Sequence, residues 1–138
     1  MACEIRPYSD RDFDGVKSLW REAFRDDPPW NSAERSIPAK LTVQPDLFLV
    51  AVEAERLMGT IMAGYDGHRG WLYAVAVRQS HRRQGIGTTL VREAETRLQA
   101  LGCAKINLQV RPTNAAVISL YQRLGYAVEE RVSMAKRF

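Results

Sequence analysis

The chain has 138 residues, of which 46% are hydrophobic and 26% charged, and its net charge is +4. This length fits one globular domain, and this composition excludes a disordered chain because it supplies enough apolar residues for a core. No apolar run approaches the roughly 20 residues that a membrane-spanning helix needs, so a membrane protein is also excluded. Two cysteines, Cys3 and Cys103, are too few for a disulfide framework, and no apolar secretory signal is visible. We therefore expect a cytoplasmic protein with reduced thiols.

The first half of the chain predicts a short strand, two helices and an antiparallel meander of three strands. Apolar residues recur at helical spacing after Ser9, which stands three residues before Asp12 as in a capping box. Three later runs are rich in apolar and β-branched residues and are separated by short turns, which is typical of strands. In chain order, the expected elements are a strand ending at Pro7, helices over 10–25 and 32–42, and strands over 47–52, 57–65 and 71–77.

The second half predicts alternating helices and strands. The strand at 71–77 is apolar on both faces, so we expect it to be central in the sheet. The fold class is α/β with a mixed sheet, in which a β-meander is followed by a βαβ unit and a C-terminal αββ segment in one domain, 1–138. The expected elements are a helix that ends before Gly102, a strand over 106–110, a helix between Asn114 and Gly125, and two short strands from Tyr126 to Phe138.

Charge is distributed unevenly along the chain. Residues 1–66 carry 12 acidic and 8 basic groups, whereas residues 67–128 carry 9 basic and 2 acidic groups. This asymmetry indicates that the second region binds an anion, either nucleic acid or a phosphorylated small molecule, unless it is only a solvated basic surface. Sixteen of the 20 basic residues are arginine, whose planar guanidinium group suits phosphate.

The loop at 82–87 combines the features of a phosphate site. Gly85 and Gly87 lack Cβ atoms, so backbone N–H groups can approach a ligand closely there. The helix that follows directs its positive N-terminal end to the same place, and Arg82 and Arg83 add formal charge. The loop matches neither the P-loop of ATPases nor the three-glycine dinucleotide motif, so we predict a pyrophosphate site of another kind. The alternative is a glycine-rich turn with surface arginines.

Two motifs give the chain a family resemblance. The string R-R-Q-G-I-G at 82–87 resembles the [RQ]-x-x-G-x-[GA] signature of the GNAT superfamily of N-acetyltransferases. The segment at 114–126 is similar to a second motif of that family, N-x-x-A-x-x-x-Y-x-x-x-G-[FY], and follows the first in the expected order. The resemblance covers nearly the whole chain, and the segments at 29–31 and 64–70 are similar to the small bacterial, single-domain YpeA-type branch.

The resemblance implies an N-acetyltransferase that uses acetyl-CoA as co-substrate and needs no metal. Backbone groups of β-strand residues in the 71–77 run would pair with the pantetheine arm, and N–H groups from the glycine loop would hold the pyrophosphate. The CoA phosphates would then be the anion that the basic region binds. The cofactor-binding residues that the resemblance implies are Val75, Val77, Arg82, Arg83, Gln84, Gly85, Ile86, Gly87, Thr88 and Asn114.

The resemblance also assigns a catalytic role to Tyr121, beside the thioester sulfur. A tyrosine, with a reference pKa of about 10, is protonated at neutral pH and can act as a general acid toward a thiolate whose reference pKa is ~8.5. A backbone N–H near Val77 could stabilise the negative charge that develops on the carbonyl oxygen. Tyr121 also follows Val117 by four residues, so a purely structural role on the apolar face of its helix remains an alternative.

The general base and the acceptor are less clearly specified. Gln109 and Trp71 stand where glutamates serve as bases in the ribosomal-protein and histone types of the family, and neither side chain accepts a proton. Asp66, His68 and Glu22 are the remaining candidates. We expect a primary amine as acceptor, either a small molecule or a peptide. Trp30 and Asn31 either line the acceptor site or, in the case of Trp30, fill the core.

Two other functions are compatible with the same sequence. A non-catalytic acyl-CoA sensor of the same fold would account for the missing glutamates. A basic nucleic-acid-binding domain is less favoured, because aromatic residues do not alternate with the arginines around 78–92. No membrane partner is expected, no metal-ligand spacing is present, and a homodimer is left open.

Overall fold

The computed structural model describes residues 3–138. The chain divides into two compact units, one reaching to Leu108 and the other running from Gln109 to Phe138. The first unit contains a five-stranded sheet and three α-helices, and the second contains one α-helix and an extended tail. Among residues 3–138, no helix combines the length and apolar character that crossing a bilayer requires.

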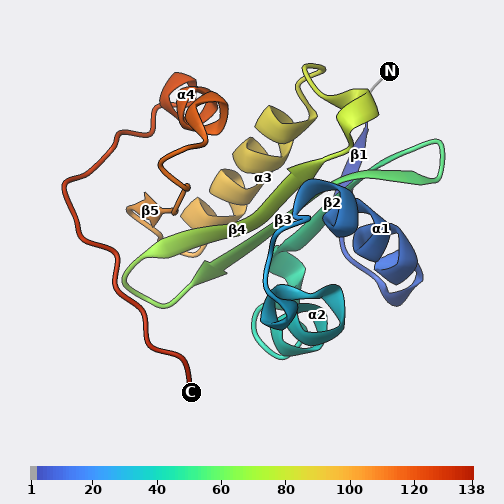
Figure 1. Ribbon diagram of the computed structural model, residues 1–138, viewed down its shortest axis with the longest axis horizontal. Coiled ribbons are helices and arrows are strands. Elements are labelled where there is room, and N and C mark those ends of the chain that lie inside the picture. The colour runs from blue at the N-terminus through green and yellow to red at the C-terminus, as the bar shows by residue number, and fades with distance from the viewer. Residues whose placement is uncertain (1–2) are drawn as a thin grey trace. The chain divides into compact units, whose positions relative to one another are not determined.

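The sheet of the first unit has the order β1-β2-β3-β4-β5 (Figure 1). Strands β1 to β4 are joined as an antiparallel meander, and β5 pairs parallel to β4 after helix α3. The βαβ unit is thus confirmed, whereas the 71–77 strand is not the central one: the middle strand is β3, and β4 lies between β3 and the short edge strand β5. The bounds are β1 Glu4–Pro7, α1 Phe13–Ala23, α2 Ala33–Lys40, β2 Phe48–Glu53, β3 Arg56–Tyr65, β4 Gly70–Val77, α3 Ile86–Ala100 and β5 Ile106–Asn107.

The helices of the first unit cover the two faces of the sheet (Figure 1). A Cβ atom placed at Gly59 would contact Leu90 and Ile86, so this β3 position faces α3. Its neighbour Thr60 faces α1, since the Trp20 indole donates a hydrogen bond to its hydroxyl. Adjacent strand residues point to opposite faces, so α1 and α3 lie on opposite sides of the sheet. The long apolar runs of β2 and β3 are buried because both of their faces are covered.

Helix α1 begins as the sequence predicts. The Asp12 carboxylate accepts a hydrogen bond from the Ser9 backbone N–H at 2.9 Å, which completes a capping box in a short 3₁₀ turn before the helix. Arg6 donates two further hydrogen bonds to the same carboxylate, at 2.8 and 2.9 Å. The first strand is therefore tied to the start of the first helix by a charged pair with two parallel bonds.

The second unit differs from the predicted C-terminal segment. Its helix α4, Ala115–Arg123, is confirmed, but the two strands expected from Tyr126 to Phe138 are not formed, so that prediction is wrong for this structure. A strand requires a partner for its backbone groups and a buried face for its apolar side chains. Here Val128, Val132 and Met134 are each at least 75% exposed, so the tail has no buried face of this kind. Strand β5 is likewise shorter than the predicted 106–110 and ends at Asn107.

Candidate functional site

A bulge interrupts strand β4 halfway along its length. In the β3–β4 ladder, Met62 stands opposite Tyr73 and Thr60 stands opposite Ala76. Two residues of β4, Ala74 and Val75, therefore oppose a single residue of β3. Ala74 adopts a left-handed conformation with φ of 50°, which residues other than glycine rarely do. The structure thus contains a β-bulge in the part of β4 that the family resemblance assigns to the pantetheine arm.

The bulge changes which side chains face which helix. Met62 and Thr60 lie two residues apart on β3 and so share one face, the face that α1 covers. Their partners Tyr73 and Ala76 share that face as well, although they are three residues apart. Regular alternation would have placed them on opposite faces. The extra residue therefore reverses the faces to which the side chains of the last residues of β4 point, relative to the alternation of the first four.

The edge of β4 that faces away from β3 is paired with β5 only at the first residues of β4. Strand β5 pairs with Gly70 and Trp71, and within the described part of the first unit the ladder goes no further. The Arg78 N–H donates to the Met58 carbonyl of β3 at 2.8 Å. Because successive N–H groups of a strand point to opposite edges, the Val77 N–H points to the open edge instead. The predicted cofactor residues Val75 and Val77 thus lie in the part of β4 whose outer edge has no strand partner.

The loop after β4 turns sharply into helix α3. Arg83 and Gly85 both have positive φ, 66° and 83°. Arg82 to Gly85 are exposed, and a Cβ atom at Gly85 would meet nothing within 4 Å, so the backbone here borders open space. Gly85 is therefore needed for its conformation, and the space beside it is available to a ligand.

The first turn of α3 presents backbone donors to that space. The first intrahelical bond is donated by the Thr89 N–H to the Gly85 carbonyl, at 2.9 Å. The N–H groups of Ile86, Gly87 and Thr88 precede it and have no partner within the helix. Gly85 occupies the N-cap position and makes no side-chain cap, as the sequence predicts. The loop thus leaves three amides and the positive helix end facing one place, an arrangement that fits a phosphate group.

Two arginines hold this connection to the rest of the first unit. Arg82 Nε donates to the Val77 carbonyl at 3.2 Å, which links the loop to the end of β4. Arg78 donates to the Leu57 carbonyl, the Gly15 carbonyl and the Ser18 hydroxyl at 3.1–3.2 Å. It thereby joins β3, β4 and α1. The residues from Val75 to Thr88 that the sequence predicts as cofactor-binding are thus brought together on one strand end and one helix start.

The remaining two predicted residues belong to the second unit. Asn114 occupies the N-cap position of α4, but its side chain makes no cap hydrogen bond and is exposed. Tyr121 is 7% exposed and packs edge-on against Tyr126, with ring centroids 5.5 Å apart. Burial raises the pKa of Tyr121 to about 12, because a phenolate is poorly solvated inside the protein. The hydroxyl of Tyr121 is therefore fully protonated at neutral pH.

Two of the three candidate bases, Asp66 and Glu22, are engaged in structural contacts. Asp66 Oδ1 accepts the backbone N–H groups of His68 and Arg69 at 2.8 and 2.7 Å, which closes the β3–β4 turn. These bonds lower the pKa of Asp66, so it is a poor proton acceptor. The Glu22 carboxylate accepts the Gln79 N–H at 2.7 Å and lies 3.7 Å from Arg78. Both carboxylates are thus explained by local structure.

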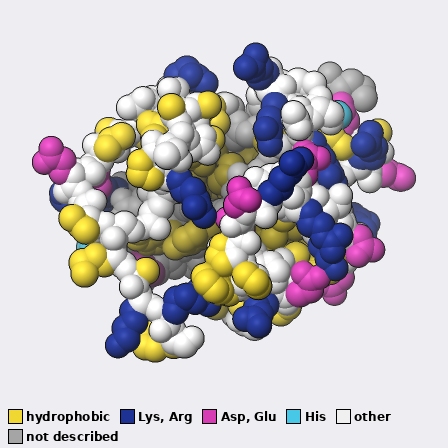
Figure 2. Space-filling model, viewed as in Figure 1, with side chains coloured by type: hydrophobic (Ala, Val, Ile, Leu, Met, Phe, Trp, Pro, Cys, Tyr) yellow, Lys and Arg dark blue, Asp and Glu magenta, His cyan; other side chains and the backbone are white. Residues whose placement is uncertain are grey.

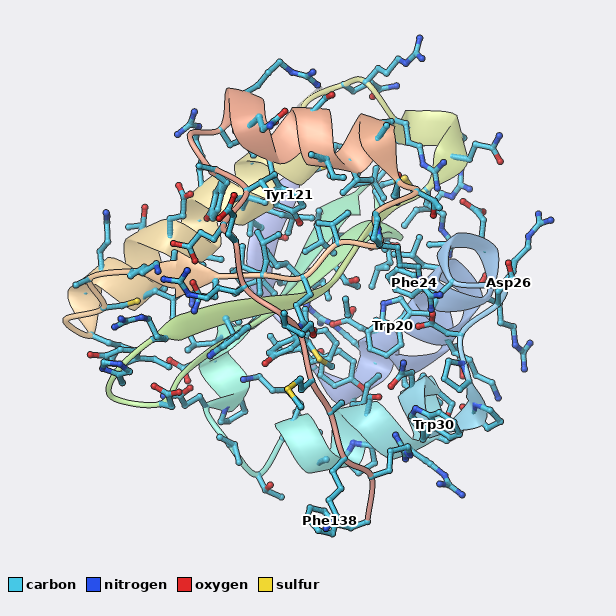
Figure 3. The ribbon with its side chains drawn as sticks, turned by 60° about the vertical axis from the view of Figure 1, so that its left-hand side comes forward. Trp20, Phe24, Asp26, Trp30, Tyr121 and Phe138 are labelled. Carbon is cyan, nitrogen blue, oxygen red and sulfur yellow. The ribbon has the colours of Figure 1, made fainter. Side chains whose placement is uncertain are left out.

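A surface cavity of about 320 Å³ lies between α1 and α2 in the first unit. Its lining includes the ring of Trp20 in α1 and the ring of Phe24 directly after this helix, which lie on the same side of the unit as Trp30 (Figure 3). Trp30 is 43% exposed, so it does not fill the core, while Asn31 lines the cavity. Basic and acidic side chains alternate over α1 and α2 on the face seen in Figure 2. The cavity therefore offers an aromatic wall with charges of both signs at its rim.

Sequence reasoning missed Thr60 and Trp20. Thr60 is fully buried, and its hydroxyl joins the Trp20 indole to the Ala74 carbonyl through two hydrogen bonds of 2.9 Å. The only sequence signal is a polar residue in an otherwise apolar strand. Among residues 3–138, no three His, Cys, Asp or Glu side chains are grouped to hold a metal.

Comparison with known proteins identifies the family. The sequence profile described as "Acetyltransferase (GNAT) family" matches residues 13–126. An acetyltransferase of Sodalis glossinidius is 46% identical over 131 residues, which cover 94% of this chain and 90% of that protein. An acetyltransferase of Pectobacterium atrosepticum is 42% identical, with 97% of this chain and 94% of that protein covered. The chain therefore belongs to the GNAT family, as its motifs predicted, and the enzyme class is N-acetyltransferase.

Solved structures show the same fold. Ard1 from Thermoplasma volcanium matches with a TM-score of 0.85 at 22% identity, covering 94% of this chain and 85% of that one. The PaiA N-acetyltransferase from Thermoplasma acidophilum, solved with coenzyme A, has a TM-score of 0.83 at 23% identity, with coverages of 96% and 94%. AAC(6')-Iy, solved with a bisubstrate analogue, has a TM-score of 0.82 at 17% identity and covers 100% and 99%. The α/β fold class is thus confirmed.

Proposed function

We propose that this chain, acting as one domain, transfers the acetyl group of acetyl-CoA to a primary amine by direct attack. The observation that carries the proposal is the arrangement in the first unit of a bulged strand with an open edge beside a glycine-opened helix start. The family and the coenzyme A bound by PaiA support the choice of co-substrate. Acetyl-CoA supplies the activated acetyl group, and the residues of this chain bind it and orient it.

The pyrophosphate is assigned to the start of α3. The amides from Gln84 to Thr88 donate to it, and Arg82 and Arg83 add positive charge in an exposed position. The pantetheine arm is assigned to the open edge of β4, where Val75 and Val77 offer backbone groups as an adjacent strand would. Asn114 contributes a contact to the same arm from the second unit.

The Val75 N–H is assigned to the thioester carbonyl oxygen. The Ala74 carbonyl accepts a hydrogen bond from Thr60 of β3. In a trans peptide the C=O of one residue and the N–H of the next point in opposite directions, and no cis peptide occurs among the described residues. The Val75 N–H therefore points away from Thr60. A fixed donor at this place stabilises negative charge as it develops on the carbonyl oxygen.

The reaction needs proton transfers at both ends. The neutral amine nitrogen forms a bond to the thioester carbon, the C–S bond breaks, and Tyr121 donates its proton to the leaving sulfur. The attacking nitrogen loses a proton to water, because the described carboxylates near β4, Asp66 and Glu22, are held in structural contacts. An α-amine, with a reference pKa of about 8, is roughly 10% neutral at pH 7, far more than a lysine at about 10.4. This favours acceptors with amines of low pKa.

The cavity between α1 and α2 is the proposed place for the body of the acceptor. Its Trp20 and Phe24 rings provide apolar contact area, and Asn31 and Asp27 provide polar groups. The bisubstrate analogue of AAC(6')-Iy, built on an acetylneamine, shows that a neighbour of the same fold takes a small amine-bearing molecule. We therefore favour a small amine over a folded protein as acceptor.

The test is steady-state kinetics with a panel of amines, amino acids and peptides, with release of free CoA as the readout. Direct attack predicts intersecting double-reciprocal lines and no acetylated enzyme by mass spectrometry when acceptor is omitted. Parallel lines with a trapped acetyl-enzyme would contradict direct attack. Tight acetyl-CoA binding without turnover of any amine would instead favour an acyl-CoA sensor.

A further inference from the structure

The bulge in β4 is held by a chain of two hydrogen bonds, the first buried and the second part-buried. The Trp20 indole N–H donates to Thr60 Oγ1 at 2.9 Å, and Thr60 Oγ1 lies 2.9 Å from the Ala74 carbonyl oxygen. Trp20 is 6% exposed and Thr60 is fully buried. These contacts connect α1, β3 and β4 at the one residue of β4 that has a positive φ.

The direction of each hydrogen bond in this chain is fixed by chemistry. An indole N–H can only donate, so the Thr60 oxygen must be the acceptor from Trp20. The single hydroxyl hydrogen of Thr60 is then committed to the Ala74 carbonyl. No other arrangement satisfies both the Trp20 indole and the Ala74 carbonyl, and no buried side-chain nitrogen or oxygen among the described residues lacks a partner.

We propose that Trp20 and Thr60 are positioning residues for acetyl transfer, acting through the bulge. This rests on the proposed function, in which the Val75 N–H donates to the thioester oxygen. By fixing the Ala74 carbonyl, the pair fixes the plane of the Ala74–Val75 peptide and hence the direction of that N–H. Trp20 also lines the cavity between α1 and α2, so the same indole touches the proposed acceptor site. Acceptor binding and donor orientation are thus linked through one side chain.

The kinetic test compares Thr60→Val, which keeps the shape of the side chain and removes the hydroxyl, with Thr60→Ser, which keeps the hydroxyl. We expect Thr60→Val to lower kcat by about ten- to a hundredfold, because a misplacement of 1 Å costs up to about 10²-fold. The affinity for CoA should change less than twofold, and Thr60→Ser should stay within threefold of the wild type. Trp20→Phe should fall between the two.

A structural role alone would give a different result. Ile37→Val changes a buried residue of the same core cluster that is outside the chain of hydrogen bonds. If the kcat of Thr60→Val, measured well below its melting temperature, matches that of Ile37→Val or Thr60→Ser, the proposal is wrong.

A second readout does not depend on turnover. In the free protein, we expect the NMR resonance of the Val75 amide proton to shift from its wild-type position in Thr60→Val and to stay close to that position in Thr60→Ser. An unchanged Val75 amide in Thr60→Val would overturn the proposal even if the kcat were lower. If the wild type turned over no amine, the proposed function would fail, while this spectroscopic comparison would still decide whether the pair fixes the bulge.

Discussion

Two irregularities interrupt the sheet, and they differ in what they leave exposed. In the β2–β3 ladder, Ala51 pairs with Gly59 and Val52 pairs with Leu57, so Met58 is an extra residue. Met58 is 1% exposed, and its carbonyl accepts a hydrogen bond from the N–H of Arg78, the residue after β4. In this first bulge, the side chain of the extra residue is thus buried in the core and its carbonyl is hydrogen-bonded.

In the second bulge, at Ala74, the carbonyl of the bulge accepts its hydrogen bond from a side chain, whereas in the first bulge it accepts one from the backbone. Its carbonyl is satisfied by the Thr60 hydroxyl, and its outer edge lies beyond the last residue pair with β5. The bulge at Met58 therefore contributes to packing, whereas the bulge at Ala74 leaves a backbone N–H donor directed outward. A bulge points to function only when its polar groups remain available to a ligand.

The largest expected effect is a difference in the free energy of unfolding between variants of the two bulges. Met58→Ala removes a fully buried side chain and should lower the free energy of unfolding by about 2–5 kcal/mol. The kcat of the folded variant should stay within twofold of the wild type, as measured below the melting transition. Ala74→Gly should show the reverse pattern, with a small change in stability and a lower kcat, because the bulge becomes less restricted. A tenfold loss of kcat in Met58→Ala would break the comparison.

Tyr121 should affect turnover without affecting binding. Loss of a general acid costs at least about 10²-fold, so Tyr121→Phe should lower kcat by about that factor. The Kd for acetyl-CoA from calorimetry should stay within twofold. Tyr126→Phe removes the hydroxyl of the ring that packs against Tyr121 and is the matched control. Equal turnover of the two variants would remove Tyr121 from the mechanism.

The pH dependence provides a separate test of the same residue. Burial raises the pKa of Tyr121 to about 12, so its neutral, proton-donating form persists as the pH rises through the ordinary range of tyrosine. We expect kcat at saturating acceptor not to decline between about pH 8 and pH 10, the reference pKa of tyrosine. A decline with a midpoint in this interval that disappears in Tyr121→Phe would contradict the raised pKa.

Substitution of the glycines at the two ends of α3 should have different effects on the affinity for acetyl-CoA. Gly85 and Gly102 have φ of 83° and 93°, and a Cβ atom at either would meet nothing within 4 Å. Gly85→Ala and Gly102→Ala should therefore destabilise the protein by similar amounts, roughly 1 kcal/mol. Only Gly85→Ala should weaken acetyl-CoA binding, by about tenfold (1.4 kcal/mol), since its methyl group enters the space assigned to the phosphates. Equal affinities in the two variants would argue against the assigned pyrophosphate site.

The smallest effect is expected at Arg82. Arg82→Lys keeps the charge but loses the Nε donor to the Val77 carbonyl. A charge-assisted hydrogen bond at an exposed site contributes about 0.5–1 kcal/mol, so acetyl-CoA affinity should fall about threefold. Titrations at low and high salt should show the same salt dependence as the wild type. A changed salt dependence would mean that the bond matters less than the position of the charge.

Local signals in the sequence predicted most of the fold. The apolar run of β4, the glycine loop and the apolar face of α3 each carry their own signal, and each forms where expected. The second helix also forms, as α2, although Pro38 lies inside it. The tail was predicted wrongly because strand formation depends on a partner, and no local pattern reveals whether a partner is present.

The candidate site was only partly accessible from the sequence. The pyrophosphate loop is a local motif, so its residues were found together. The bulge was not, because it depends on how Met62 and Thr60 pair with a strand more than ten residues away. The hydrogen bond from Trp20 to Thr60 spans 40 residues and has no sequence signature.

The most direct test of the central claim is calorimetric titration of the protein with acetyl-CoA and with S-acetylpantetheine, which lacks the pyrophosphate. We predict measurable binding of acetyl-CoA, at least tenfold weaker binding of S-acetylpantetheine, and a difference between the two ligands that is about tenfold smaller in Gly85→Ala. Equal affinity of the wild type for the two ligands, or no heat with acetyl-CoA at millimolar concentration, would contradict the account.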